Sequence, residues 1–167
     1  MKAVLVILLL LSNLSQAGVM RDSYLQSPLL IGQGTLHFLW WEVYDIKLFT
    51  NNTSFSWEYP FLLEFDYKRE VKKEDVMQST LKELRRQQAV SEKDTLKWQK
   101  YLDQTFQSVQ VGTRAILYWG PEGKITFHYE HSNPEVIQDG NFARAFFNIW
   151  LGEETSQPQL RKNLINE

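Results

Sequence analysis

The segment that most constrains the fold is a strongly aromatic helix predicted near the C-terminus, at residues 139–152. Asp139 can accept hydrogen bonds from the N–H groups of a first helical turn, and Gly152 is expected to end the helix in the left-handed conformation. The apolar side chains that share one helical face are Phe142, Phe146, Ile149 and Trp150, with Phe147 and Leu151 beside them. A helix this aromatic must pack against a large flat surface, and a β-sheet supplies one.

The middle of the chain has the alternation expected of such a sheet. In residues 61–69 the apolar side chains of Phe61, Leu63, Phe65 and Tyr67 alternate with Glu64, Asp66 and Lys68. One face of this strand is therefore expected to be covered and the other to meet polar surroundings, which favours antiparallel pairing. The other predicted strands are residues 36–41, 43–50, 55–58, 111–119 and 124–130.

Two helices are predicted between these groups of strands. One spans residues 72–88, and the other begins at Ser91, which has the capping-box spacing to Asp94. A closing helix is predicted from Pro158, a residue suited to a first helical turn. The order of strands, helices, strands and helices predicts an α+β domain in which helices pack on one face of an antiparallel sheet.

The N-terminus has the features of a secretory signal peptide at residues 1–17. A positively charged start precedes an apolar run at residues 3–11, and a small-x-small site ends at Ala17. The alternative is a membrane anchor, but the run is much shorter than the ~20 residues that a spanning helix needs. We therefore expect cleavage after Ala17, a periplasmic or secreted location, no membrane span after cleavage, and a single domain at residues 18–167.

Composition and motifs exclude several classes of function. The formal net charge is −2 without long basic blocks, so no nucleic-acid partner is expected. The chain has no cysteine, which excludes thiol catalysis, cysteine-ligated zinc and iron–sulfur clusters. His128 and His131 point to opposite faces if they lie on a strand, so a pair of surface histidines is favoured over a metal site. The segment Gly32-Gln33-Gly34 is too short to be a dinucleotide-binding motif. Its glycines are interpreted as relieving backbone strain where a strand begins. No cofactor is expected.

Five polar side chains are the candidates for ligand binding, because they are expected beside aromatic surface: Tyr44, Arg114, Tyr118, Arg144 and Asn148. Arg114 and Tyr118 share one side of a predicted strand, where a cation and a phenol could hold a carboxylate in an apolar cleft. The favoured alternative is that Arg114 extends to solvent along its apolar stem while Tyr118 packs. Arg144 could instead pair with Glu153 or Glu154.

Other polar and aromatic residues receive a structural interpretation. The acidic pair Glu64 and Asp66 is interpreted as solvated surface charge, without an indication of a raised pKa. Trp40 and Trp41 are consecutive, so one is expected in the core and the other on a different surface. No residue is assigned a catalytic role.

Two segments resemble the chalcone isomerase-like family, in its secreted bacterial branch. The segment FARAFFNIWLGEETSQPQLRKNLI is similar to the C-terminal signature of that family. The segment GTLHFLWWEVYDIKLFT, residues 34–50, is similar to its first hairpin. The resemblance covers most of the chain after residue 17, and it implies an open-faced β-sandwich.

The resemblance also implies what this chain lacks. Plant enzymes of the family close a chalcone into a flavanone, and related non-enzymatic members bind fatty acids in the cleft between sheet and helices. Both activities are implied to use an arginine early in the first strand and a hydroxyl-bearing residue further along. Leu36 and Leu48 stand at the matching positions, so an enolate or carboxylate would meet no cation there. A shift of one residue would place His37 at the arginine position, where it would be mostly neutral at pH 7.

We therefore expect a secreted or periplasmic, non-catalytic member of this family. It is expected to bind an apolar or fatty-acyl ligand, or a protein partner that the sequence does not identify, in the sheet–helix cleft. An isomerase or intramolecular lyase with a rearranged site, using Arg114, Tyr118 or Tyr44, is the second hypothesis. A purely structural or interaction protein with a filled interior is the third.

Overall fold

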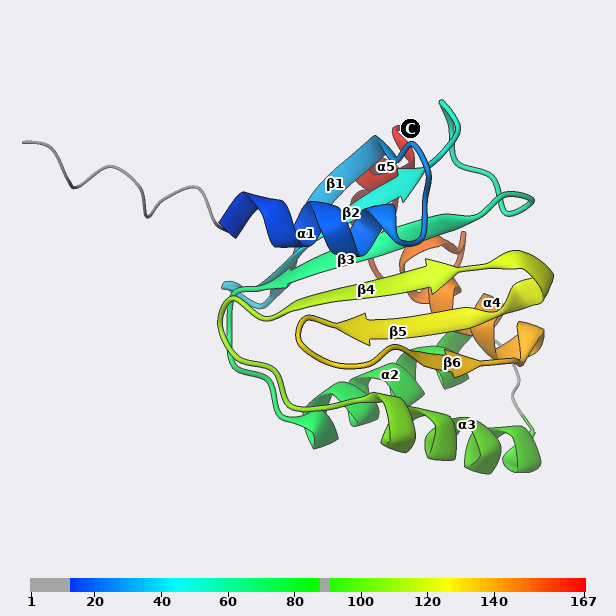
Figure 1. Cartoon of the computed structure of the whole chain (residues 1–167). Helices are drawn as coiled ribbons and strands as arrows, with labels where there is room; N and C mark the ends of the chain where they lie inside the picture. The colour runs from blue at the N-terminus through cyan, green and yellow to red at the C-terminus, as the bar shows by residue number, and fades with distance from the viewer. Residues whose placement is uncertain (1–12, 88–90) are drawn as a thin grey trace, which may run out of the picture.

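The computed structural model describes residues 13–87 and 91–167 (Figure 1). The strands are β1 (Leu29–Phe38), β2 (Trp41–Thr50), β3 (Phe61–Tyr67), β4 (Arg114–Trp119), β5 (Ile125–Tyr129) and β6 (Glu135–Ile137). The helices are α1 (Asn13–Asp22), α2 (Lys73–Gln87), α3 (Glu92–Thr105), α4 (Gly140–Leu151) and α5 (Pro158–Ile165), with a 3-10 turn η1 (Pro121–Gly123). The six strands form one antiparallel sheet in sequence order, which confirms the predicted α+β class.

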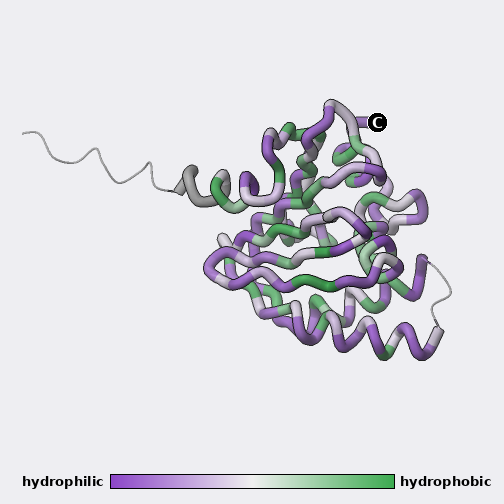
Figure 2. Tube along the Cα trace, turned by 45° about the vertical axis from the view of Figure 1, so that its right-hand side comes forward, coloured by the Kyte–Doolittle hydropathy of each residue, from purple (hydrophilic) through white to green (hydrophobic). Residues whose placement is uncertain are grey.

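One face of the sheet is apolar and carries the main core. The pairing register aligns Leu48 with Leu63, Leu63 with Leu117, and Leu117 with Phe127, and all four side chains are buried. Helices α2 to α5 cover this face; in Figure 1, α4 lies behind the sheet, and α2 and α3 lie below it. In Figure 2 the helices along the lower edge are mostly hydrophilic, as expected of helices that bury a single stripe.

Helix α4 provides the aromatic layer that packs on this face. Its N-cap is Asp139, whose carboxylate accepts a hydrogen bond from the Phe142 N–H, as predicted. The aromatic stripe is buried against the strands. The predicted left-handed end is wrong, because Gly152 has an extended conformation with φ −75°. Glycine is needed there for space, since a Cβ would lie 2.7 Å from the carbonyl oxygen of Asn148.

Two glycines of β1 let the closing helix approach the sheet. A Cβ at Gly32 would overlap the carbonyl oxygen of Asn163, and one at Gly34 would overlap the side chain of Leu160. Both contacts are with α5. The interpretation of these glycines as relief at a strand entry is therefore wrong, and their role is to allow close helix packing.

The opposite face of the sheet is also partly covered, by α1 and the residues that follow it. Leu25 packs there on Phe49, Leu62 and Ile116 to form a second, smaller apolar cluster. In Figure 1, α1 lies in front of the sheet. The interpretation of Glu64 as solvated is wrong, because its side chain is only 5% exposed beneath this cover.

Several predicted boundaries differ from the structure. The β1–β2 hairpin turns at Leu39 and Trp40, so neither Trp40 nor Trp41 enters the core, and their exposed fractions are 76% and 49%. Residues 55–58 form a loop and turn instead of a strand, and the short strand β6 was not predicted. Two predicted features lie outside the described residues: the apolar run at residues 3–11, and residue 88, the predicted end of the first of the two central helices. No helix in the described part of the chain is long and apolar enough to cross a membrane.

Candidate ligand-binding pocket

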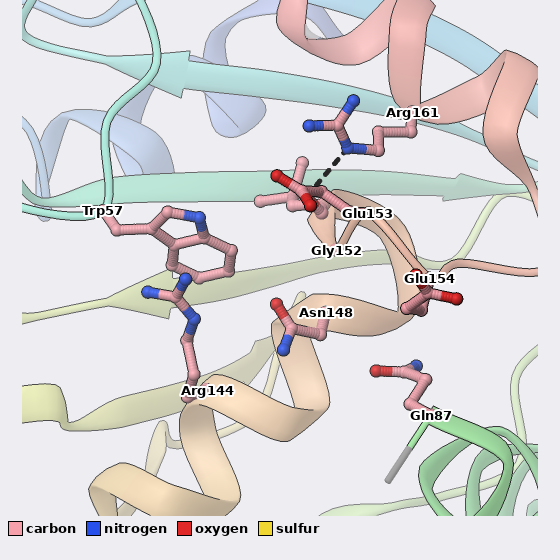
Figure 3. Close-up of a pocket in the computed structure, with 9 residues that line it drawn as sticks. Trp57, Gln87, Arg144, Asn148, Gly152, Glu153, Glu154 and Arg161 are labelled. Carbon is pink, nitrogen blue, oxygen red and sulfur yellow. Dashed lines mark hydrogen bonds between the residues drawn. The ribbon is translucent and has the colours of Figure 1, made fainter.

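A pocket of about 350 Å³ opens beside the C-terminal half of α4 (Figure 3). Helix α4 contributes Arg144, Asn148 and Leu151, and the turn after it contributes Gly152, Glu153 and Glu154. The remaining walls are Trp57 from the β2–β3 loop, Gln87 at the end of α2, and Arg161 from α5. Segments from four parts of the sequence therefore meet at this pocket.

The helical period of α4 places the polar wall of the pocket. Arg144 and Asn148 are four residues apart, so they lie on one side of the helix, away from the aromatic stripe. The same helix therefore fixes the core with one face and lines the pocket with the other. Because the aromatic stripe is buried, the direction of the polar stripe is fixed as well.

The aromatic wall of the pocket is Trp57. Its ring contacts Phe61 at a centroid distance of 5.5 Å and Trp119 at 5.6 Å, both edge to face. Phe61 and Trp119 belong to the strands beneath α4. Trp57 thus joins the pocket to the aromatic core beneath α4.

The Arg144 guanidinium stacks on Trp57, with its Cζ atom 3.6 Å from the ring centroid. Partial burial holds the pKa of Arg144 below its usual value, since burial disfavours the charged form. The predicted alternative, an ion pair with Glu153 or Glu154, does not form in the described part of the chain. The Arg144 side chain is exposed, so an incoming anion can reach a guanidinium that has no carboxylate partner in the described part of the chain.

The second arginine of the pocket has partners of its own. Arg161 donates from Nε to the carbonyl oxygen of Leu151 at 3.2 Å, and its Nη1 lies 3.0 Å from the Glu167 carboxylate. Arg161 is therefore held in place by α4 and the C-terminal residue. Across the pocket, Gln87 Nε2 is buried without a hydrogen-bond partner among the described residues. This amide is a further donor that a ligand could engage.

The other three candidate residues lie elsewhere. Tyr44 is buried in the core, where its hydroxyl accepts a hydrogen bond from Trp150 Nε1 at 2.9 Å, and burial raises its pKa. Arg114 and Tyr118 lie on the opposite face of the sheet. Arg114 Nε donates to Asp66 at 2.8 Å, and the Tyr118 ring packs on Tyr24 at 4.9 Å.

The structure therefore brings together two of the five candidates, Arg144 and Asn148. The sequence did not identify Trp57, Gln87 or Arg161 as pocket residues. No local pattern marks them, because each becomes a neighbour of α4 only through the fold. The distance in sequence between α4 and a tryptophan or arginine elsewhere in the chain does not indicate whether that residue packs beside α4.

The positions that the family resemblance marks for catalysis are apolar in the structure. Leu48 is fully buried, and Leu36 packs against the core beside Tyr44, its partner in the register of β1 and β2. His37 lies at the exposed edge, 3.8 Å from the Glu42 carboxylate. His128 contacts the Tyr24 hydroxyl at 2.9 Å. Within residues 13–87 and 91–167, no group of three or more His, Asp or Glu side chains is placed to hold a metal ion.

Comparisons with known proteins identify the family and the fold of this chain. No curated protein sequence matches the chain at a significant level. The fold is similar to the crystal structure of the Arabidopsis thaliana fatty-acid binding protein AtFAP1, with a TM-score of 0.64 and 11% sequence identity. That likeness covers 84% of this chain and 87% of the plant chain, and it concerns the fold. A sequence model described as chalcone isomerase-like matches residues 25–166, so the chain belongs to the chalcone isomerase-like family.

Proposed function

We propose that this protein is a non-catalytic, ligand-binding member of the family, of the secreted bacterial branch, which binds an apolar acid such as a fatty acid. The carboxylate is held at the Arg144 pocket, and the apolar part lies along Trp57. The observation that carries the proposal is the Arg144 guanidinium, which stacks on Trp57 without a carboxylate partner in the described part of the chain. The fold likeness to a fatty-acid binding protein supports the same ligand class.

The proposal of a non-catalytic role rests on Leu36 and Leu48. Neither side chain can stabilise a developing oxyanion, and such stabilisation is usually the largest part of catalysis at a carbonyl. An absorbance assay with a chalcone is expected to show no turnover above the rate in solution. Turnover that a Tyr44→Phe variant abolishes would instead favour an isomerase with a rearranged site.

The proposed export rests on the sequence of residues 1–17. The side chains that pack α1 and the residues after it on the sheet include Met20, Arg21, Tyr24 and Leu25, all of which follow Ala17. Cleavage after Ala17 would therefore keep them. N-terminal sequencing of the protein recovered from its producing cell is expected to start at Gly18, whereas an intact Met1 would refute the cleavage.

The binding proposal can be tested with one pair of variants. Native mass spectrometry of the purified protein is expected to show a bound fatty acid, and titration with oleic acid gives the affinity. Arg144→Gln is expected to weaken binding by about tenfold or more, because a charge-assisted hydrogen bond is worth about 1.5–3 kcal/mol. The matched control is Arg85→Gln, an exposed arginine of α2 outside the pocket.

Two outcomes would contradict the binding proposal. One is a wild-type protein that takes up no fatty acid at any concentration below micelle formation. The other is equal affinity in wild type and Arg144→Gln, which would show that the acid does not use this pocket. Trp57→Leu provides a second measure, because it removes the aromatic wall while it leaves Arg144 in place.

A further inference from the structure

The tip of the β1–β2 hairpin is the most exposed apolar surface that the structure describes. The hairpin tip (residues 38–41) consists of four large apolar side chains in sequence, Phe38, Leu39, Trp40 and Trp41. Their exposed fractions are 69%, 70%, 76% and 49%. Single exposed apolar residues are ordinary, but four consecutive ones at a protruding turn mark an interaction site.

The backbone of the tip makes this choice of residues more unusual. Leu39 has φ 56°, in the left-handed region that asparagine, aspartate and glycine adopt most easily. A leucine there is sterically costly, and its side chain is left in water. The turn therefore has neither the residue that its geometry favours nor the polarity that its position favours. A residue that is unfavourable in both respects points to a role outside the fold.

The surroundings of the tip suit the interface between lipid and water. The Arg69 guanidinium stacks on Trp41, with its Cζ atom 4.2 Å from the ring centroid. Lys68 pairs with Glu42 at 3.0 Å, which neutralises the acidic residue nearest the tip. Tryptophan and arginine side chains are enriched at the headgroup level of membranes, where an apolar body and a polar edge are both accommodated.

We infer that the hairpin tip is a membrane-contact site, which inserts its side chains into the interfacial layer of a lipid bilayer. A convex tip of four side chains is too small for a stable protein interface, which buries about 800 Å² on each partner. Lipid needs no complementary shape, so a small protruding apolar tip is sufficient. This inference does not depend on the ligand proposed for the Arg144 pocket.

The absence of cysteine in the chain allows a site-specific test. Trp40→Cys is labelled with an environment-sensitive fluorophore and mixed with vesicles of equal parts phosphatidylcholine and phosphatidylglycerol. The emission is expected to shift to the blue and to rise severalfold. The matched control is the same label on Leu96→Cys, in α3, where the native side chain is 57% exposed and no change is expected.

A second variant measures how much the tip contributes to binding. Leu39→Gly combined with Trp40→Asn places glycine at the positive-φ position and a turn-forming residue after it, so the fold should be at least as stable, which thermal unfolding checks. Co-sedimentation of residues 18–167 with the same vesicles is expected to fall by more than about tenfold, because two large apolar side chains leave the lipid.

Three outcomes would overturn the inference. A label at position 40 that stays in water while the protein co-sediments would place the lipid contact elsewhere on the chain. Equal co-sedimentation of the wild type and the Gly-Asn variant would show that the tip contributes nothing. A blue shift that grows with protein concentration without vesicles would identify a second copy of the chain as the occupant.

Discussion

The two faces of the β-sheet are built from alternate residues of the same strands, yet they are stabilised in different ways. On the helix face, rings interlock edge to face, as between Phe61 and Phe147 at 5.0 Å. On the α1 face, the small cluster around Leu62 and Ile116 is bordered by ion pairs. Among these, Arg21 and Lys47 lie 3.6 and 3.7 Å from the Glu64 carboxylate.

The difference between the faces concerns how each tolerates charge. Among the described residues, the helix face buries no charged side chain, and the hydroxyl of its buried Tyr44 accepts a hydrogen bond from Trp150. The α1 face buries Glu64 without a hydrogen bond to its Oε2 atom in the described part of the chain. Burial of a carboxylate is costly even with cations nearby. The helix face therefore supplies most of the stability, while the α1 face depends on one short segment.

The largest expected effect comes from a substitution in the helix face. Phe147→Ala removes a fully buried ring that contacts Phe61 and Trp119. We expect the free energy of unfolding to fall by about 3–5 kcal/mol, through lost burial and the cavity left behind. Urea denaturation measures it. Leu96→Ala, at an exposed position of α3, should change stability by less than about 0.5 kcal/mol. A loss below about 1 kcal/mol for Phe147→Ala would mean that this face is not the main core.

A smaller loss is expected for the cover of the α1 face. Leu25 is 1% exposed and packs on Leu62 and Ile116. Leu25→Ala should lower the free energy of unfolding by about 2–3 kcal/mol, at the low end for leucine because the cluster is small. Val19→Ala is the control from the same segment, since Val19 is 67% exposed. If the two variants have the same stability, the segment after α1 is not docked on the sheet.

Sequence patterns predicted the helix face well and the α1 face poorly. In α4, the capping residue Asp139 and the helical spacing of the aromatic residues both predict the same helix. The α1 face has no such period, because Met20, Tyr24 and Leu25 are too few to mark an amphipathic helix. They also follow directly on a segment with the features of a signal peptide.

Strand β4 shows why the candidate site was only partly predicted. Ala115, Leu117 and Trp119 face the helices, while Ile116 and Tyr118 face α1. Both sides of this strand are apolar, so its alternation could not assign Arg114 and Tyr118 to a face. Helix α4 has a single apolar stripe, so the helical period alone puts Arg144 and Asn148, four residues apart, on the same side of the helix.

The smallest predicted effect is a pH dependence that belongs to the α1 face. Burial raises the pKa of Glu64, although Arg21 and Lys47 act to lower it. The folded state then binds the Glu64 proton more tightly than the unfolded state does. Its contribution to stability is therefore fully present below the unfolded pKa, with a reference value of 4.5. That contribution is lost as the pH rises through the folded pKa.

Glu64→Gln keeps the shape of the protonated carboxyl and does not titrate. The stability of the wild type relative to this variant should therefore decline as the pH rises from about 4 to about 7. Asp45→Asn is a control of opposite sign. Burial acts to raise the pKa of Asp45, but hydrogen bonds from Thr35 and Lys68 hold it below its ordinary value. The stability of the wild type relative to Asp45→Asn should therefore increase as the pH rises through the acid range. A Glu64→Gln difference that is flat or that rises with pH would show that the cations beneath α1 outweigh the cost of burial, and that the two faces treat charge alike.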